Sequence, residues 1–408
     1  MRAWRVPYPK FGQGQGLARV SIIAERLGVD LPGFGARGAG VVGSNGKGST
    51  AAMAAALLAQ TGACVGLFTS PHLLRLNERF RINGEDISDE ELDRHWRHVA
   101  RAAEDADLAT QIGAFEFLFL IAADWFATRG CVHSVWEAGI GGRYDPVRLI
   151  EAKRLALTAL DLEHTELLGG ALSEIACDKL DAAPREATLY TDADCVVRDA
   201  VAARCAERGV RLVLVDANAL GDIALPLAGA HQRGNAALAL HLAGDTAQLS
   251  QNAVRTGLAA TRWPGRLETI EADPMVVIDV GHTPLAIAAA LQGFNVLRGS
   301  RAGVLVCGAS MDKRANEIIS ALAPEFATII CAAARHKGAL SAEIARYAYA
   351  ANPNAEITVA DSVAEARALA SAKARALGAA VYVAGGLFLA AEYKAVALGR
   401  DVDSLVFL

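Results

Sequence analysis

Residues 41–50, Val-Val-Gly-Ser-Asn-Gly-Lys-Gly-Ser-Thr, restrict the possible folds of this chain more than any other stretch. The small apolar residues 39–42 predict a buried strand, and the Ala-, Leu- and Met-rich residues that follow the stretch predict a helix. A glycine-rich loop between a strand and a helix is the context that a phosphate-binding loop requires. We therefore expect an α/β fold with an anion site at this loop.

The residue types in the loop indicate how it would hold a nucleotide. Its glycines let backbone N–H groups turn inward around an anion, and the start of the next helix adds unsatisfied donors. Lys47 supplies a cation for the outer phosphates, and the Ser49 hydroxyl can ligate Mg²⁺. A glycine-rich turn without a ligand is the alternative. The run Lys-Gly-Ser-Thr favours a nucleotide site made of Gly43, Ser44, Asn45, Gly46, Lys47, Gly48, Ser49 and Thr50.

Length, charge and cysteine content narrow the class of protein. A chain of 408 residues can form two or three domains, and a net charge of −5 gives no reason to expect a nucleic-acid partner. The seven cysteines are scattered without a CxxC pair, which is typical of reduced thiols. The first residues have no apolar signal segment, and no apolar run reaches membrane-spanning length. We expect a cytoplasmic protein that contacts no membrane.

Polar residues follow several predicted strands, where open α/β sheets bind ligands. The strand at 64–68 leads into Ser70 and into Arg75, Arg79 and Arg81, which suit either a solvated face or a grip on a carboxylate. The strand at 132–136 ends in Glu137, which suits either Mg²⁺ or a helix cap. Alone, His164 after the strand at 155–160 reads as a loop histidine, and Lys179 on the helix at 172–180 reads as a solvated lysine.

Two further stretches define the organisation of the chain. Residues 33–38 match GxGxxG by letter, but they precede a strand, so we reject them as a dinucleotide site. Pro264 and Gly265 mark a domain boundary, because strand-like and Ala-rich helical runs alternate from Met275 onward. That alternation predicts a second, smaller domain with a parallel sheet.

Several ordered motifs resemble those of the folylpolyglutamate synthase/dihydrofolate synthase family, a branch of the ATP-dependent Mur ligases. The family's GTNGKGS is similar to residues 43–49, and its SPHL…NER is similar to 70–73 and 77–79. Its GLGGR resembles 139–143, its DHT…LG resembles 163–169, and its downstream lysine falls on Lys179. Its HQ…NA and WPGRLE match within 229–235 and 263–268. The resemblance covers nearly the whole chain.

The resemblance implies a fold, two domains and a set of site residues. It implies a P-loop-containing, Mur-ligase-like ATPase domain over 1–265 and a smaller Rossmann-like ligase domain over 266–408. The implied catalytic residues are Lys47, Lys179 and His164, and the implied Mg²⁺ ligands are Ser49, Glu137, His164 and a carbamylated Lys179. The implied ATP contacts outside the loop are Asn235, Arg266 and Asp279, and the implied contacts to the incoming glutamate are Ser70, Arg79 and His282.

The implied activity joins a carboxylic acid to an amino group with ATP and Mg²⁺, through an acyl phosphate. Glutamate and a pterin- or folate-like acid are the implied partners, and we expect a monomer. The chain departs from the family at Tyr144-Asp145-Pro146, at Asp178 to Ala183, and at Thr283, which replaces an asparagine. These departures leave two alternatives open: a ligase of the same fold with another acid and amine, and a nucleotide-binding regulator without ligase chemistry.

Overall fold

A computed structural model describes residues 5–311 and 314–407 of the chain, which divide into two compact units. The first unit contains residues 5–226 and Gln232–Arg262. The second contains Leu227–His231 and Trp263–Phe407. Each unit has its own sheet and its own hydrophobic core.

The sheet of the first unit has eight strands in the order β4-β3-β2-β5-β1-β6-β7-β8. The strands from β2 to β8 in this order are parallel, and β3 and β4 are added antiparallel at one edge. Their bounds are β1 (Gly38–Val42), β2 (Val65–Phe68), β3 (Phe80–Ile82), β4 (Glu85–Asp86), β5 (His133–Glu137), β6 (Arg154–Leu157), β7 (Thr188–Asp192) and β8 (Arg211–Val215).

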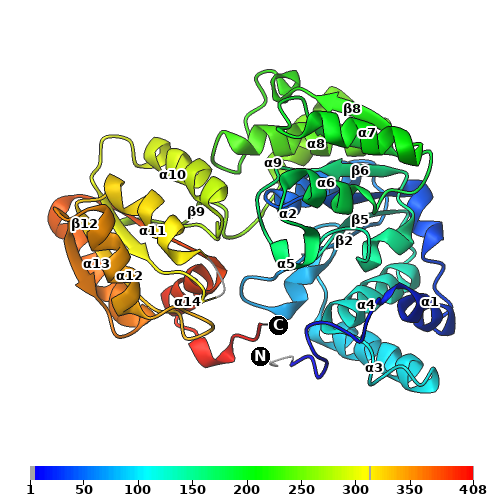
Figure 1. The fold of residues 1–408 in the computed structure, drawn as a ribbon, viewed down its shortest axis with the longest axis horizontal. Coiled ribbons are helices and arrows are strands. Elements are labelled where there is room, and N and C mark those ends of the chain that lie inside the picture. Colours follow the sequence, from blue (N-terminus) through cyan, green and yellow to red (C-terminus); the bar gives the residue numbers. More distant parts are fainter. Residues whose placement is uncertain (1–4, 312–313, 408) are drawn as a thin grey trace. The chain divides into compact units, whose positions relative to one another are not determined.

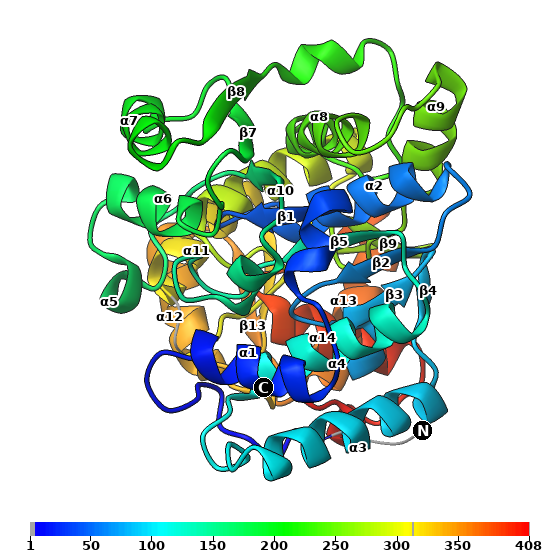
Figure 2. The ribbon, with the colours of Figure 1, turned by 90° about the vertical axis from the view of Figure 1, so that its right-hand side faces the viewer.

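Helices lie on both faces of this sheet. The α-helices are α1 (Leu17–Arg26), α2 (Lys47–Ala59), α3 (Asp89–Asp105), α4 (Ala114–Thr128), α5 (Thr165–Leu168), α6 (Leu172–Leu180), α7 (Arg198–Arg208), α8 (His231–Gly244) and α9 (Gln251–Ala260). In Figures 1 and 2, α1, α3 and α4 group together, while α2 packs with α9 on the other face. Short 3-10 helices are η1 (Pro32–Arg37), η2 (Leu76–Arg79), η3 (Pro146–Ile150) and η4 (Ala217–Leu220).

The side chains of β2 and β5 point alternately to the two faces of the sheet, so some enter the core and others lie on the face that carries the loop. Phe68 and Trp136 are fully buried and pack against rings of α4, with Trp136 5.2 Å from Phe119 between ring centroids. Successive residues of a strand point to opposite faces. Glu137, the residue after Trp136, is therefore directed away from this aromatic core and toward the face that carries α2.

The second unit has a six-stranded sheet in the order β13-β12-β11-β14-β10-β9. Its strands are β9 (Glu268–Ala272), β10 (Met275–Ile278), β11 (Gly303–Cys307), β12 (Thr328–Cys331), β13 (Glu356–Val359) and β14 (Ala380–Ala384). Its α-helices are α10 (Pro284–Arg298), α11 (Ala315–Leu322), α12 (Ser341–Ala351), α13 (Val363–Leu377) and α14 (Leu387–Ala397), with 3-10 helices η5 (Ala323–Glu325) and η6 (Val402–Ser404). Phe294 and Tyr382 stack in its core with ring centroids 4.4 Å apart.

The predicted α/β class with two parallel-sheet regions is confirmed. The second sheet has one antiparallel edge strand, β9, which the prediction of a parallel sheet did not include. The rejected glycine stretch lies in η1 except for its last residue, Gly38, which begins β1. Within the described residues, no helix is both long and apolar enough to cross a membrane.

Candidate active site at the glycine loop

The glycine loop lies at the centre of the first sheet, because β1 is flanked by β5 and β6. Gly46 has a φ of 90°, and a Cβ atom there would lie 2.4 Å from the Asn235 side-chain oxygen. Gly43 has a φ of 143°, and its Cβ would overlap the Thr158 hydroxyl. Both positions therefore require glycine. The predicted ATP contact Asn235 lies directly against the loop.

The loop is held by its neighbours and by its own lysine. The backbone N–H groups of Ser44 and Asn45 both donate to the Ala159 carbonyl at 2.9 Å. Lys47 Nζ donates to the carbonyls of Gly43, at 2.9 Å, and Ser44, at 3.2 Å. The cation thus lies over the loop backbone, at the start of α2, where a helix end favours an anion.

Two further observations are consistent with phosphate binding at this loop. Ser49 and Thr50 are buried in the first turn of α2. Among the described residues, Thr50 Oγ1 has no hydrogen-bond partner. A buried hydroxyl without a partner is uncommon in a native protein and suits an absent ligand oxygen.

Glu137, Ser70 and Arg79 lie together beside the loop. Glu137 pairs in register with Val41 of β1, is buried, and accepts a hydrogen bond of 3.0 Å from the Ser70 N–H. Arg79 is buried and donates from Nε to His72 Nδ1 at 2.9 Å. Burial lowers the pKa of Arg79 to about 10, although the charge of Glu137 opposes that shift.

The three arginines predicted near this strand do not act as one group. Arg75 donates to Asp89 at 2.8 Å, and Arg81 donates to Asp86 at 2.8 Å. Arg79 lies near enough to Glu137 for the charge of that carboxylate to act on its pKa. Glu78, beside it, accepts three backbone N–H bonds from residues 73–75, so this acid shapes the segment.

Lys179 is tied to the loop through a carboxylate that sequence reasoning did not single out as its partner. Its Nζ donates to the Gly43 carbonyl at 2.8 Å and to Glu163 Oε1 at 2.9 Å. The Lys179 and Glu163 side chains are only 2% and 10% exposed. Lys179 is therefore a buried ion-paired group, and not the solvated lysine that it resembles when read alone.

The pKa shifts agree with this cluster of charges. Burial would raise the pKa of Glu163, but Lys47 and Lys179 lower it to about 2. Burial and the nearby Lys47 lower the pKa of Lys179, and Glu163 opposes the shift. One carboxylate thus compensates two ammonium groups that both donate to the Gly43 carbonyl.

His164 follows Glu163 in the loop after β6 and has a φ of 48° as the residue before α5. Its Nδ1 lies 3.9 Å from Glu166 Oε1, and its side chain is 24% exposed. In residues 5–311 and 314–407, no three His, Cys, Asp or Glu side chains gather as a metal site. The Mg²⁺ ligands predicted from the family include only two residues of these types, Glu137 and His164. The other two predicted ligands are Ser49 and Lys179. The hydroxyl and carboxylate of this set are oxygen ligands of the kind that Mg²⁺ prefers, whereas imidazole is a softer nitrogen ligand.

The second glycine-rich loop, residues 139–143, is fastened to the helix that carries Lys179. Asp178 accepts from the Gly142 N–H at 3.0 Å, and Asp181 accepts from Arg143 Nε at 2.9 Å. Asp145 accepts backbone N–H bonds from Gly139, Ile140 and Val147. Burial raises the pKa of Asp145 to about 6 despite these bonds.

The second unit holds the remaining predicted residues. Asp279 is buried, and its two oxygens accept from the N–H groups of Leu267, at 3.0 Å, and Gly281, at 2.7 Å. Arg266 donates to the Pro264 carbonyl at 3.1 Å, and His282 Nδ1 lies 3.3 Å from the Val280 carbonyl. Thr283, which replaces the family's asparagine, caps α10 by accepting from the Ala286 N–H at 3.3 Å.

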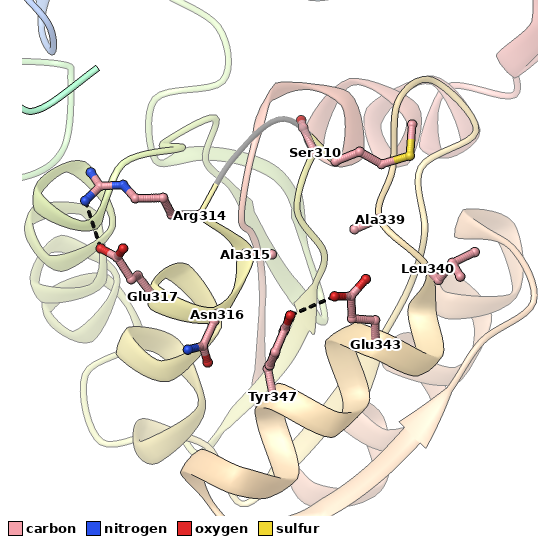
Figure 3. Close-up of a pocket in the computed structure, with 10 residues that line it drawn as sticks. Ser310, Arg314, Ala315, Asn316, Glu317, Ala339, Leu340, Glu343 and Tyr347 are labelled. Carbon is pink, nitrogen blue, oxygen red and sulfur yellow. Dashed lines mark hydrogen bonds and ion pairs between the residues drawn. The ribbon is translucent and has the colours of Figure 1, made fainter. Parts of the chain in front are cut away.

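A cavity of about 490 Å³ in the second unit contains none of the predicted site residues. Figure 3 shows it between the start of α11 and the first half of α12. Its charged lining is already paired, since Arg314 donates to Glu317 at 2.9 Å and Tyr347 donates to Glu343 at 2.7 Å. We therefore assign the candidate site to the glycine loop of the first unit.

Comparisons with known proteins identify the family. Residues 265–387 match the family model "Mur ligase, glutamate ligase domain". The chain is 33% identical over 313 residues to the dihydrofolate synthase/folylpolyglutamate synthase of Bacillus subtilis, covering 69% of this chain and 72% of that protein. It is 33% identical over 390 residues to a probable bifunctional folylpolyglutamate synthase/dihydropteroate synthase of Haloferax volcanii.

The Haloferax match covers 87% of this chain but 45% of that protein, so the chain spans about half the length of such relatives. A solved Mycobacterium tuberculosis folylpolyglutamate synthase complexed with ADP aligns with a TM-score of 0.87 at 27% identity, over 96% of each chain. The matched sequence motifs, the fold and the glycine-loop geometry agree. The chain belongs to the folylpolyglutamate synthase/dihydrofolate synthase family of the Mur ligases.

Proposed function

We propose that this chain is an ATP-dependent ligase that adds L-glutamate to dihydropteroate or to a folate. The observation that carries the proposal is the grouping of Lys47, Lys179 and Glu163 around the Gly43 carbonyl, at the loop where α2 begins. The names of the Bacillus and Mycobacterium relatives support the substrates. The seven free cysteines suit a reaction in the cytoplasm.

Carboxylates are poor electrophiles, so the acid must be activated before an amine can attack it. Transfer of the γ-phosphoryl group of ATP to the acid gives an acyl phosphate and ADP. Lys47 would leave the loop carbonyls to neutralise charge on the transferring group. The N–H groups at the start of α2 would hold the phosphates in place.

Ser49, Glu137 and His164 are the proposed Mg²⁺ ligands. Bound Mg²⁺ neutralises charge on the phosphates and aligns them for transfer. Lys179 is proposed to be carbamylated in the working enzyme, which turns a cation into a carboxylate. A carbamate beside Glu163 would put two anions in a buried place that now holds an ion pair, and that change suits a divalent cation.

The incoming amine must be unprotonated to attack the acyl phosphate. Ser70, Arg79 and His282 are the proposed contacts to the amino acid, and a guanidinium such as that of Arg79 can bind its carboxylate. Asn235, Arg266 and Asp279 are the proposed ATP contacts beyond the loop. Orienting both reactants supplies much of the rate, since a well-aligned pair can contribute roughly 7–11 kcal/mol.

The decisive experiment supplies ATP, Mg²⁺, glutamate and either dihydropteroate or a folate to the full chain. Phosphate release that depends on the acid, with a product one glutamate heavier by mass spectrometry, is the expected result. Lys47→Ala should abolish both signals, while the exposed control Lys153→Ala should keep them. ATP binding without any amide product would refute the addition of glutamate to these acids.

A ligase of the same fold for another acid and amine is the second candidate. The replacement of the family asparagine by Thr283 favours it, because a threonine hydroxyl cannot offer a ligand the paired amide donor and carbonyl acceptor of an asparagine. Amide formation with another acid and amine, but none with pterin acids and glutamate, would select this candidate.

A further inference from the structure

Two thiols at one end of the first sheet are close enough to react with each other. Cys64 precedes β2 and Cys131 precedes β5, and these strands are parallel neighbours. The N–H groups of Val132 and His133 both donate to the Cys64 carbonyl, at 2.9 and 3.2 Å, which fixes the two backbones side by side. The two Sγ atoms are 3.1 Å apart.

We propose that Cys64 and Cys131 are a modification site: a dithiol that a peroxide oxidises reversibly to an intramolecular disulfide. A disulfide needs its sulfurs about 2.05 Å apart, so they must approach by roughly 1 Å, which small side-chain rotations can supply. Both residues are partly exposed, so a small oxidant can reach them.

The chain contains a second pair that serves as an internal comparison. Cys307 and Cys331 face each other in register on β11 and β12, with Sγ atoms 4.0 Å apart. Both are fully buried. Burial keeps a peroxide out, and the longer distance leaves more movement to be made, so this pair should stay reduced under conditions that oxidise Cys64 and Cys131.

The chemistry divides the roles of the two sulfurs. Burial and the neighbouring Cys64 sulfur raise the pKa of the Cys131 thiol well above its usual range, so Cys131 stays protonated. The nucleophile in such a step is a thiolate, and we assign that role to Cys64. It attacks one oxygen of hydrogen peroxide, the O–O bond breaks, and the departing hydroxide takes a proton to become water. Cys64 is left as a sulfenic acid.

The second step closes the disulfide. The Cys131 sulfur attacks the Cys64 sulfur, the S–O bond breaks, and the hydroxide leaves with the Cys131 proton as a second water. Two thiols lose two electrons, and one peroxide gains them. The bond closes a loop that contains residues 65–130, so it should stabilise the first unit.

The position of the pair predicts that this oxidation does not block the candidate active site. Both thiols precede the first residues of β2 and β5. Ser70 follows the other end of β2, and Glu137 is the last residue of β5. The bond therefore joins the starts of β2 and β5, at the end of the sheet opposite the glycine loop. Nucleotide binding should persist.

The test treats the full chain with hydrogen peroxide, alkylates the remaining thiols and maps the unreduced peptides by mass spectrometry. The expected result is one cross-linked species that joins the Cys64 and Cys131 peptides and disappears with dithiothreitol, while Cys307 and Cys331 are alkylated. Separate sulfinic or sulfonic acids at Cys64 and Cys131, or preferential linkage of Cys307 to Cys331, would overturn the proposal. Because this measurement uses the unmutated chain, it does not depend on the folding of a variant.

Thermal unfolding provides a second readout. Oxidation should raise the melting temperature of the wild-type chain by several degrees, and dithiothreitol should reverse the change. Cys131→Ser should show no reversible rise, whereas Cys331→Ser should keep it. An equal rise in the Cys131→Ser chain would assign the effect to another thiol and contradict the proposal.

Discussion

Removing the Glu163 carboxylate tests the charge cluster that underlies the candidate site. Glu163→Gln keeps the size of the side chain but leaves the Lys179 ammonium buried against the Gly43 carbonyl without its counter-charge. The substitution also leaves Lys47 and Lys179 to repel each other at one acceptor. We expect a loss of stability in the first unit.

The size of the loss follows from the pKa of Glu163, which falls from an ordinary value of 4.5 to about 2 in the folded chain. At 1.36 kcal/mol per unit, this shift corresponds to about 3 kcal/mol of stability. Because the folded pKa is lowered, the contribution is fully present above pH 4.5 and is lost as the pH falls toward 2. Breaking a buried ion pair from one side costs a similar ~3–5 kcal/mol.

The assay is urea unfolding at pH 7, without added bicarbonate or metal, followed by tryptophan fluorescence, to which the buried Trp136 of the first unit contributes. Glu163→Gln, Lys179→Met and the double variant form a thermodynamic cycle. Since Lys47 also contributes to the Glu163 shift, we expect a coupling of about 2 kcal/mol between Glu163 and Lys179. Glu207→Gln is the matched control in the same unit, because its side chain is 64% exposed where it pairs with Arg204, and such surface pairs contribute ~0–1 kcal/mol.

Additive effects in the cycle would refute the reasoning. A coupling below about 0.5 kcal/mol would mean that the two side chains do not interact in solution as their 2.9 Å contact implies. A Glu163→Gln effect no larger than that of Glu207→Gln would lead to the same conclusion.

Further predictions concern the loop, a buried acid and a helix cap. Lys47→Ala should abolish acid-dependent ADP formation with an unchanged circular dichroism spectrum; undiminished turnover would contradict the loop assignment. Gly46→Ala should weaken ATP binding at least tenfold in equilibrium dialysis, because the new Cβ meets Asn235; unchanged affinity would show that the loop adapts. Burial raises the pKa of Asp145 from 3.8 to about 6, so wild type should lose about 2 kcal/mol relative to Asp145→Asn between pH 4 and 7 in urea titrations; a constant difference would contradict that shift. Thr283→Ala should lower the stability of the second unit by about 1 kcal/mol in urea unfolding, with Thr283→Ser close to wild type; an equal loss in both would exclude capping.

Local patterns allowed the glycine loop to be predicted from the sequence. The contacts around it could not be predicted in the same way, because they depend on pairing between residues far apart in the chain. The strand before the loop and the helix after it are encoded by neighbouring residues, so β1 and α2 were anticipated. Which acid faces Lys179 depends on the register of β1 with β6 and on how α6 packs, and neither is written in a local pattern. Glu163 directly precedes His164, a residue that the resemblance already placed in the site. This position was the one sequence feature that could have identified its carboxylate as the partner of Lys179.

Residues that deviate from the family pattern look like signs of altered chemistry when the sequence is read alone. In the folded chain, several of them have structural partners instead. Asp178 holds the N–H of Gly142, and Asp181 accepts from Arg143 and Arg204, so the acids around Lys179 fasten α6 to the second glycine loop and to α7. A substitution that anchors an element adjacent to a site can keep the site's geometry, and it need not change the substrate. The distinction between a changed substrate and a changed scaffold therefore depends on what each deviating side chain contacts, and for Asp178 and Asp181 the contacts favour the scaffold.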